Sequence, residues 1–253
     1  MNLMRLTRKS LLCCSPLVGV LLLGGYQAAQ RAAAPAGDPL IEGFKKTTSS
    51  SVSDAIDQVV GQRGFMAHDM RPQIPGAFVG RATTALLRPA PPEKATMALT
   101  ARHSVEMLDN AEPGQVGVIV IEDGLDVAGL GGLMGTTAKA RGMAGIVIDG
   151  GVRDLAQLRA LALPVYARSV VPSSSAGRFA SVARDIPVKC AGVTVRPGDI
   201  IVADEDGVVV VPAERAEGVL KRALEIDARE AKMFPLIRQY KSLQKVVEMF
   251  NRI

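Results

Sequence analysis

The residues of this sequence that could carry chemistry gather in one stretch, Ile146 to Asp154, which reads IVIDGGVRD. Its apolar start is typical of a buried strand, and a glycine turn then leads directly into Arg153 and Asp154. Strand ends are where α/β proteins present functional groups. Asp154 could hold a hard cation such as Mg²⁺, while Arg153 could pair with a carboxylate or a developing oxyanion. A helix N-cap beside a surface arginine would explain the same pair, and the pattern alone leaves both interpretations open.

A second candidate is the glycine run from Gly129 to Gly135 (GLGGLMG), which lies between a predicted strand and a predicted helix. Glycines there allow backbone N–H groups to converge on a carboxylate or phosphate at the helix N-terminus, although simple turn packing also explains them. Asp149 lies near the distance expected of a ribose-binding acid. Nucleotide binding is nevertheless disfavoured, because the sixth position is Met134 rather than glycine and the run does not directly follow its strand.

The elements around these candidates indicate a mixed α/β fold with a β-rich second half. Apolar runs predict buried strands, and helical spacing with capping residues predicts helices between them. The strands are expected at 116–122, 145–149 and 164–168 and as several short strands within 187–212; the helices are expected at 47–60, 98–110, 132–142, 154–161 and 213–233. Asp199, Asp204 and Asp206 are interpreted as turn formers. Pro235 is expected to end the long helix before a final helix around Val246.

The charge of the chain is concentrated at its start. The 253 residues have a formal net charge of +5, but residues 1–34 contain four basic residues and no acid. Without them the body has 26 basic and 25 acidic residues, so it shows no excess of positive charge that would attract phosphates. We therefore expect no nucleic-acid partner.

Residues 1–34 are predicted to be a signal peptide or an N-terminal anchor. Arg5, Arg8 and Lys9 form a positive start, and the apolar run from Leu11 to Gly25 is short for a bilayer span. The protein is therefore expected to be exported to the periplasm, with membrane contact only through this segment. A mis-assigned start codon would instead leave it cytoplasmic.

Cysteine and histidine chemistry is not expected in the body of the chain. Cys190 is the one cysteine outside the leader, so the body cannot form an internal disulfide, and its apolar neighbours predict a small buried side chain. His68 and His103 lack the spacing of zinc ligands.

The longer motifs resemble those of a known family. GGLMGTTAKARGMAGIVIDGGVRD, LPVYAR and GVTVRPGDIIVADEDGVVVVP are similar to segments of the 4-hydroxy-4-methyl-2-oxoglutarate aldolase / RraA-like family, in the same order and spacing. The resemblance implies a swivelling β/β/α domain, with a mixed sheet core and flanking helices, over residues 47–234. Residues 35–46 would be a linker and residues 235–253 a C-terminal helical extension. It also implies a homotrimer or a hexamer, with active sites between subunits.

The resemblance assigns roles to individual residues. The backbone of Gly131, Gly132, Leu133 and Met134 would bind the carboxylate of a 2-oxo acid. Arg153 would contact the substrate oxygen, and Asp154 would be the ligand of Mg²⁺ or Mn²⁺. Glu230 is the candidate for the proton-handling acid that another subunit's C-terminal helix supplies. One departure stands out: many members carry an acidic residue near the position of Gly132.

The implied activity is that of a class II, metal-dependent aldolase. It would cleave 4-hydroxy-4-methyl-2-oxoglutarate or a similar small 2-oxo acid to pyruvate by a retro-aldol reaction, and it would decarboxylate oxaloacetate through the same enolate. The alternative is a non-catalytic RraA-like regulator that binds a ribonuclease. Retention of both Arg153 and Asp154, together with the export signal, favours the enzyme.

Overall fold

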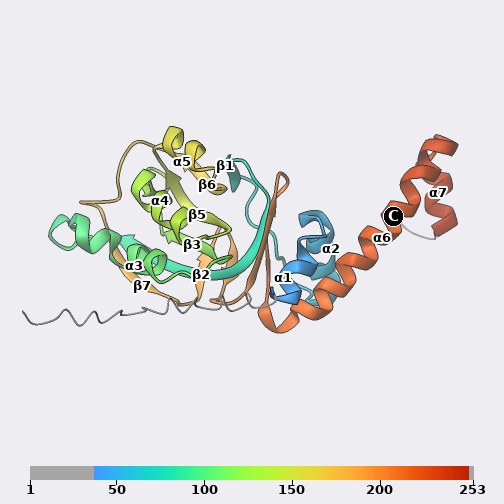
Figure 1. Ribbon diagram of the computed structural model, residues 1–253, viewed down its shortest axis with the longest axis horizontal. Coiled ribbons are helices and arrows are strands. Elements are labelled where there is room, and N and C mark those ends of the chain that lie inside the picture. The colour runs from blue at the N-terminus through green and yellow to red at the C-terminus, as the bar shows by residue number, and fades with distance from the viewer. Residues whose placement is uncertain (1–36, 251–253) are drawn as a thin grey trace, which may run out of the picture. The chain divides into compact units, whose positions relative to one another are not determined.

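The computed structural model describes residues 37–250 (Figure 1). The predicted signal peptide over 1–34 lies outside the described residues. Among the described residues, no helix is both long and apolar enough to cross a bilayer.

A mixed sheet forms the centre of the fold, with the strand order β1-β6-β5-β3-β2-β10-β11. The central pairs β2–β3, β3–β5 and β5–β6 are parallel. The outer pairs are antiparallel, namely β1–β6, β2–β7, β2–β10 and β10–β11. β4 pairs with the end of β5, and β7 pairs with β2. The strands are β1 (Arg71–Ile74), β2 (Phe78–Pro89), β3 (Val116–Ile121), β4 (Ala128–Leu130), β5 (Gly145–Val152), β6 (Val165–Val170), β7 (Phe179–Arg184), β10 (Ile200–Asp204) and β11 (Gly207–Val211), beside a separate hairpin of β8 (Val188–Cys190) and β9 (Val193–Val195).

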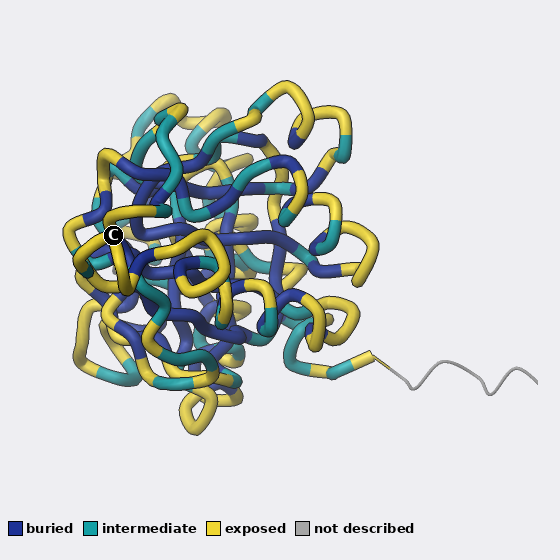
Figure 2. The backbone as a smooth tube through the Cα atoms, turned by 90° about the vertical axis from the view of Figure 1, so that its left-hand side faces the viewer, coloured by how far each residue is buried: buried dark blue, intermediate teal, exposed yellow. Residues whose placement is uncertain are grey.

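Helices cover the sheet in two groups. The first group, whose apolar side chains share a core with β3, β5 and β6, consists of α3 (Met97–Asp109), α4 (Gly132–Ala140) and α5 (Leu155–Leu161). The second packs on β10 and β11 and consists of α1 (Pro39–Phe44), α2 (Ser49–Val59) and α6 (Ala216–Tyr240). α7 (Leu243–Phe250) follows α6, and short 3₁₀ helices occupy Pro92–Lys94 and Ala213–Arg215. Figure 2 shows the buried stretches of the chain inside and the exposed stretches around them.

This architecture confirms the expected α/β class, with a mixed sheet core and flanking helices. The predicted strands and helices on either side of the candidate residues are present as β3, α4, β5, α5 and β6. The aspartates interpreted as turn formers stabilise turns. Asp199 accepts the backbone N–H of Arg196 within its turn, and Asp204 accepts the backbone N–H of Asp206 within the next one. Asp204 and Asp206 also accept hydrogen bonds from Ser49 and Ser50, which join this turn to α2.

Two boundaries differ from the sequence-based expectations. Residues 39–44, expected within a linker, form α1, because Asp38 caps the helix, Pro39 favours its first turn and Phe44 is fully buried. Pro235 does not end the long helix: α6 continues through it to Tyr240. The expected boundary between residues 234 and 235 therefore falls inside a helix.

Candidate active site

The end of β5 places Arg153 and Asp154 beside the start of α4. The backbone N–H of Arg153 donates to the carbonyl oxygen of Leu130 over 3.0 Å, which ties this end of β5 to β4. Asp154 follows in the left-handed region, with φ 57° and ψ 39°, and is the N-cap residue of α5. This conformation costs most residues about 1–2 kcal/mol, but aspartate and asparagine adopt it more readily.

The Asp154 carboxylate does not cap its own helix. No side-chain hydrogen bond caps α5; instead, Asp154 Oδ2 accepts the backbone N–H of Gly132 over 2.9 Å. Arg153 Nε lies 3.8 Å from the same oxygen. The two side chains are 38% and 43% exposed. The simple N-cap interpretation is therefore wrong for the side chain, which faces the glycine turn.

Gly131 permits this close approach. A Cβ atom on Gly131 would lie 2.6 Å from Asp154 Oδ2 and 3.1 Å from Arg153 Nε. Gly131 is also the N-cap residue of α4 and has no side chain to accept the first N–H groups of that helix. These N–H groups form a positive helix end beside Arg153, which suits an anion.

The other residues expected to bind the substrate carboxylate differ in their surroundings. Leu133 is 89% exposed, whereas Met134 packs against the core and lines a small cavity with Arg153. Gly132, Leu133 and Met134 form the first turn of α4. The structure thus brings together Gly131 to Met134, Arg153 and Asp154.

Gln157 fills the space above Gly132. A Cβ atom on Gly132 would lie only 1.7 Å from Gln157 Oε1. Any larger side chain at position 132 would therefore have to displace the amide of Gln157 on α5.

The donor set around Asp154 suits only certain metals. Within residues 37–250, no group of three His, Cys, Asp or Glu side chains is arranged to hold a metal ion, so a closed zinc site does not fit. Mg²⁺ and similar hard cations need only one or two protein carboxylates, with water and substrate oxygens completing the shell. Because no hydrogen bond among the described residues uses Asp154 Oδ1, the carboxylate fits such a site.

Asp149 has a structural role rather than a ribose-binding one. It is 9% exposed, its Oδ1 pairs with Arg168 over 2.9 Å, and its Oδ2 accepts the backbone N–H of Ala191 over 2.5 Å. Arg168 also binds Asp69 over 2.8 Å and holds the pKa of that carboxyl below its ordinary value through their hydrogen bond. Asp149 is thus already engaged, which further disfavours nucleotide binding at the glycine run.

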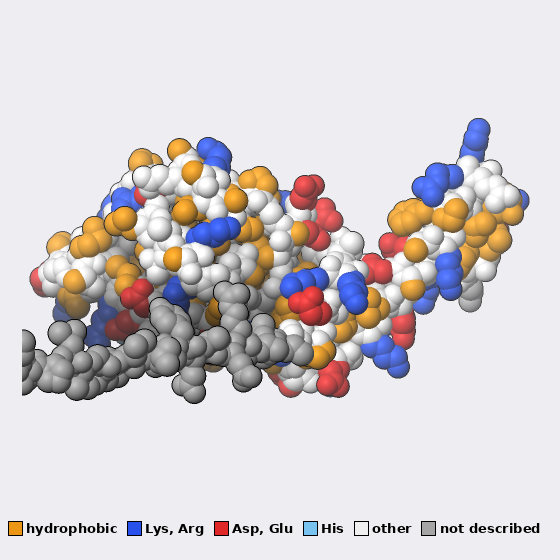
Figure 3. All heavy atoms as spheres, in the orientation of Figure 1, with side chains coloured by type: hydrophobic (Ala, Val, Ile, Leu, Met, Phe, Trp, Pro, Cys, Tyr) orange, Lys and Arg blue, Asp and Glu red, His pale blue; other side chains and the backbone are white. Residues whose placement is uncertain are grey.

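Glu230 lies elsewhere on the chain. It borders a groove of about 250 Å³ between α2, α6 and α7, whose lining shares no residue with the cavity beside Arg153. Hydrophobic side chains gather over α6 and α7 in Figure 3, and Phe234, Leu243 and Met249 are more than half exposed. Within one chain, Glu230 does not join Arg153. Its role as an acid supplied to another subunit remains a prediction.

Sequence reasoning missed the residues that close the site from other elements. Gln157 from α5, Ser104 from α3 and Ser175 from the loop before β7 lie around Gly131 and Arg153. No motif marks these residues, because long-range packing brings them there: α3 packs on β7 and α4, the loop pairs with β4 at Ala128, and α5 packs on α4.

The fold agrees with the comparison to known families. The family model described as RraA-like, Aldolase/RraA, matches residues 49–210, and the chain belongs to this family. A Deinococcus radiodurans protein named "Putative 4-hydroxy-4-methyl-2-oxoglutarate aldolase" is 46% identical over 104 residues, which are 40% of this chain and 64% of that protein. A Halalkalibacterium halodurans protein of the same name is 38% identical over 114 residues, 45% of this chain and 53% of that protein. The chain thus matches less than two thirds of the length of either relative.

Solved structures show the same fold. An uncharacterized protein from Pseudomonas syringae pv. tomato is 27% identical with a TM-score of 0.72, covering 85% of this chain and 99% of that one. Streptomyces coelicolor RraAS2, described as an unusual member of the RNase ES inhibitor RraA family, is also 27% identical, with a TM-score of 0.68 and coverage of 79% and 97%. The family thus includes relatives named as aldolases and relatives named as ribonuclease inhibitors.

Proposed function

We propose that this protein is a divalent-metal-dependent lyase that cleaves small 2-oxo acids such as 4-hydroxy-4-methyl-2-oxoglutarate to pyruvate, and that it also decarboxylates oxaloacetate. The observation that carries the proposal is the convergence of Arg153, Asp154 and the N-terminus of α4 on one turn. A cation, a carboxylate and unpaired N–H donors are the groups that binding of a 2-oxo acid with a metal requires. The family relatives named as aldolases support the same reaction class.

Each group has a defined task in this reaction. The backbone N–H groups of Leu133 and Met134 bind the substrate carboxylate at the positive end of α4. Arg153 donates to the 2-oxo oxygen and stabilises the negative charge that collects there as the carbon–carbon bond breaks. Gly132 holds Asp154 Oδ2 in place, so that Asp154 can bind Mg²⁺ or Mn²⁺ through its other oxygen. The bound cation would supply Lewis-acid polarisation of the 2-oxo group.

Retro-aldol cleavage must also remove the proton of the substrate's C4 hydroxyl and return a proton to the enolate carbon, which requires a carboxyl group other than that of Asp154. In the proposal, Glu230 of a neighbouring copy supplies this carboxyl group within a homotrimer or hexamer. The leader over 1–34 is proposed to export the protein to the periplasm. Because Glu230 lies apart from Arg153 in one chain, the assembly can be tested separately. Glu230→Gln should lower turnover while metal binding at Asp154 is kept.

The test is pyruvate release by the purified protein from 4-hydroxy-4-methyl-2-oxoglutarate and from oxaloacetate, with Mg²⁺ and with EDTA. Asp154→Asn should abolish metal-dependent turnover, because the amide keeps the left-handed backbone but removes the charge. Asp185→Asn is a matched control, since Asp185 also has a positive φ, of 52°, and is also 43% exposed. Turnover that is equal in EDTA, or unchanged in Asp154→Asn, would refute the proposal.

A binding role without catalysis is the alternative, and the likeness to RraAS2 is the observation that favours it. It predicts a folded protein that releases no pyruvate from either substrate under any metal condition. It also predicts that Asp154→Asn has no effect on the binding of a ribonuclease. The same set of variants therefore separates the two functions.

A further inference from the structure

A small cavity opens beside Arg153, and no residue of α5 lines it. Its volume is about 70 Å³, and its wall comes from α3, from the turn between β4 and α4, and from the loop that contains Ser174 and Ser175. Arg153 is the charged residue among those that line it, and no acidic side chain does so. The cavity thus has the charge for an anionic group and room for a small one.

Ser104 is the unusual residue of this wall. Its side chain is 2% exposed, and its hydroxyl has no hydrogen-bond partner among the described residues. Thr100, one helical turn earlier, donates its hydroxyl to the carbonyl oxygen of Phe179 over 2.5 Å. A buried hydroxyl without a partner is unfavourable, so its position beside a cationic cavity calls for an explanation.

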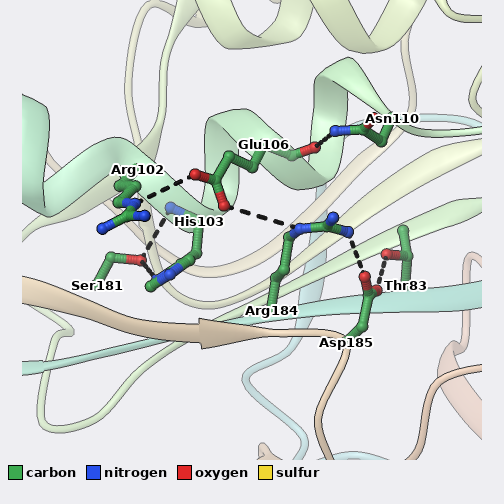
Figure 4. Close-up of polar contacts among 8 residues, drawn as sticks. All are labelled: Thr83, Arg102, His103, Glu106, Asn110, Ser181, Arg184 and Asp185. Carbon is green, nitrogen blue, oxygen red and sulfur yellow. Dashed lines mark hydrogen bonds and ion pairs between the residues drawn. The ribbon is translucent and has the colours of Figure 1, made fainter.

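The orientation of α3 is fixed from its other face (Figure 4). His103 Nδ1 lies 2.9 Å from Ser181 Oγ on β7, and Glu106 lies 3.8 Å from Arg184 on the same strand. These contacts hold α3 against β7. One face of α3 lines the cavity and carries Met97, Thr100, Ala101 and Ser104. Their spacing of three and four residues places them on the same side of a helix.

We propose that Ser104 is a substrate-contacting residue, whose hydroxyl donates a hydrogen bond to a carboxylate oxygen of the bound 2-oxo acid while Arg153 balances its charge. This inference rests on the proposed function and adds a specificity-determining residue to the same site. The ligand supplies the acceptor that the protein lacks. Because the volume is small, the carboxylate of a short 2-oxo acid fits and a bulky substituent does not.

The test compares Ser104→Ala with the wild type in the full protein. Oxalate, an analogue of the pyruvate enolate, is titrated calorimetrically in the presence of Mg²⁺, and KM and kcat are measured for oxaloacetate. A lost hydrogen bond to a carboxylate should weaken oxalate binding and raise KM by about tenfold or more, with a smaller change in kcat. The melting temperature should not fall, because no hydrogen bond within the protein is lost.

Ser181→Ala is the matched control. It removes a serine hydroxyl that supports α3 from the opposite face, so it should lower the melting temperature and leave oxalate affinity unchanged. Oxalate affinity of Ser104→Ala within twofold of the wild type would overturn the role of Ser104 alone. If the wild type binds neither oxalate nor pyruvate, both this inference and the proposed function are wrong.

Discussion

Asp154 Oδ2 accepts the backbone N–H of Gly132 over 2.9 Å and so joins the end of β5 to the first turn of α4. The bond exists because Asp154 adopts the left-handed conformation, which turns its carboxylate away from α5. Among residues 37–250 no hydrogen bond uses the other oxygen, Oδ1, and the bond to Gly132 holds the carboxylate in one orientation. One residue therefore determines both the geometry of the glycine turn and the position of the proposed cation.

Asn and Ala at position 154 should differ in stability. Asparagine tolerates φ near 57° and its amide oxygen can still accept from Gly132, whereas alanine loses the bond and meets the left-handed penalty. Asp154→Asn should therefore be more stable than Asp154→Ala by about 1–2 kcal/mol in urea unfolding. Both variants should lose Mg²⁺ binding. Equal stability of the two would show that the Asp154–Gly132 bond does not form.

Alanine at Gly131 should lower the activity, whereas alanine at Gly132 should not. At Gly131 the new Cβ would lie 2.6 Å from Asp154 Oδ2, so the site must shift and turnover should fall by about tenfold or more. At Gly132 it would meet the end of the flexible Gln157 side chain, which can rotate away. Gly132→Ala should then keep the activity and change the unfolding free energy by no more than about 1 kcal/mol. A larger loss of turnover at Gly132 than at Gly131 would contradict this geometry.

The elements next to the site could be predicted because local signals agree there. The run VGVIVI is apolar throughout, as a strand covered on both faces requires, and it forms β3. Helix α6 shows where such reasoning fails. Pro235 removes one backbone donor, yet the helix continues to Tyr240, because a proline kinks or weakens a helix without always ending it.

The site could be predicted only for those of its residues that lie close together in the sequence. Arg153 and Asp154 are adjacent in sequence, and the glycine turn precedes them by one helix and one strand, so one motif contains them all. Ser104 and Gln157 have no such signal. The packing of α3 on β7 brings Ser104 to the cavity that Arg153 also lines, and the closeness of Gln157 to Gly132 depends on how α5 lies beside α4. Long-range packing of this kind leaves no local pattern in the sequence.

Removal of Arg168 should destabilise the fold strongly. Its guanidinium bridges Asp69 and the nearly buried Asp149, which would be left without its ionic partner. Arg168→Met should cost about 3–5 kcal/mol in urea unfolding at neutral pH. Lys45→Met, which breaks an exposed pair with Glu42, should cost less than about 1 kcal/mol.

The cost of Arg168→Met should depend on pH in a defined direction. The hydrogen bond from Arg168 holds the pKa of Asp69 below its ordinary value, so the folded state binds this proton more weakly than the unfolded state does. The stabilisation is therefore complete above the unfolded pKa of about 3.9 and is lost as the pH falls through the lower folded pKa. The difference between wild type and Arg168→Met should narrow on acidification below about pH 4. A difference that widens there would exclude this pairing.

Cys190 should be inert in the folded protein. It is fully buried beside Met66, and burial raises the pKa of its thiol well above the ordinary value, so almost no thiolate forms at neutral pH. With Cys13 and Cys14 replaced by serine, a thiol reagent should react with Cys190 only as fast as the protein unfolds, and urea should accelerate the reaction. Thr194→Cys in a Cys190→Ala background places a thiol at an exposed position of the same hairpin and should react at once. Rapid labelling of Cys190 without denaturant would show that the β8–β9 hairpin opens independently of the rest of the fold.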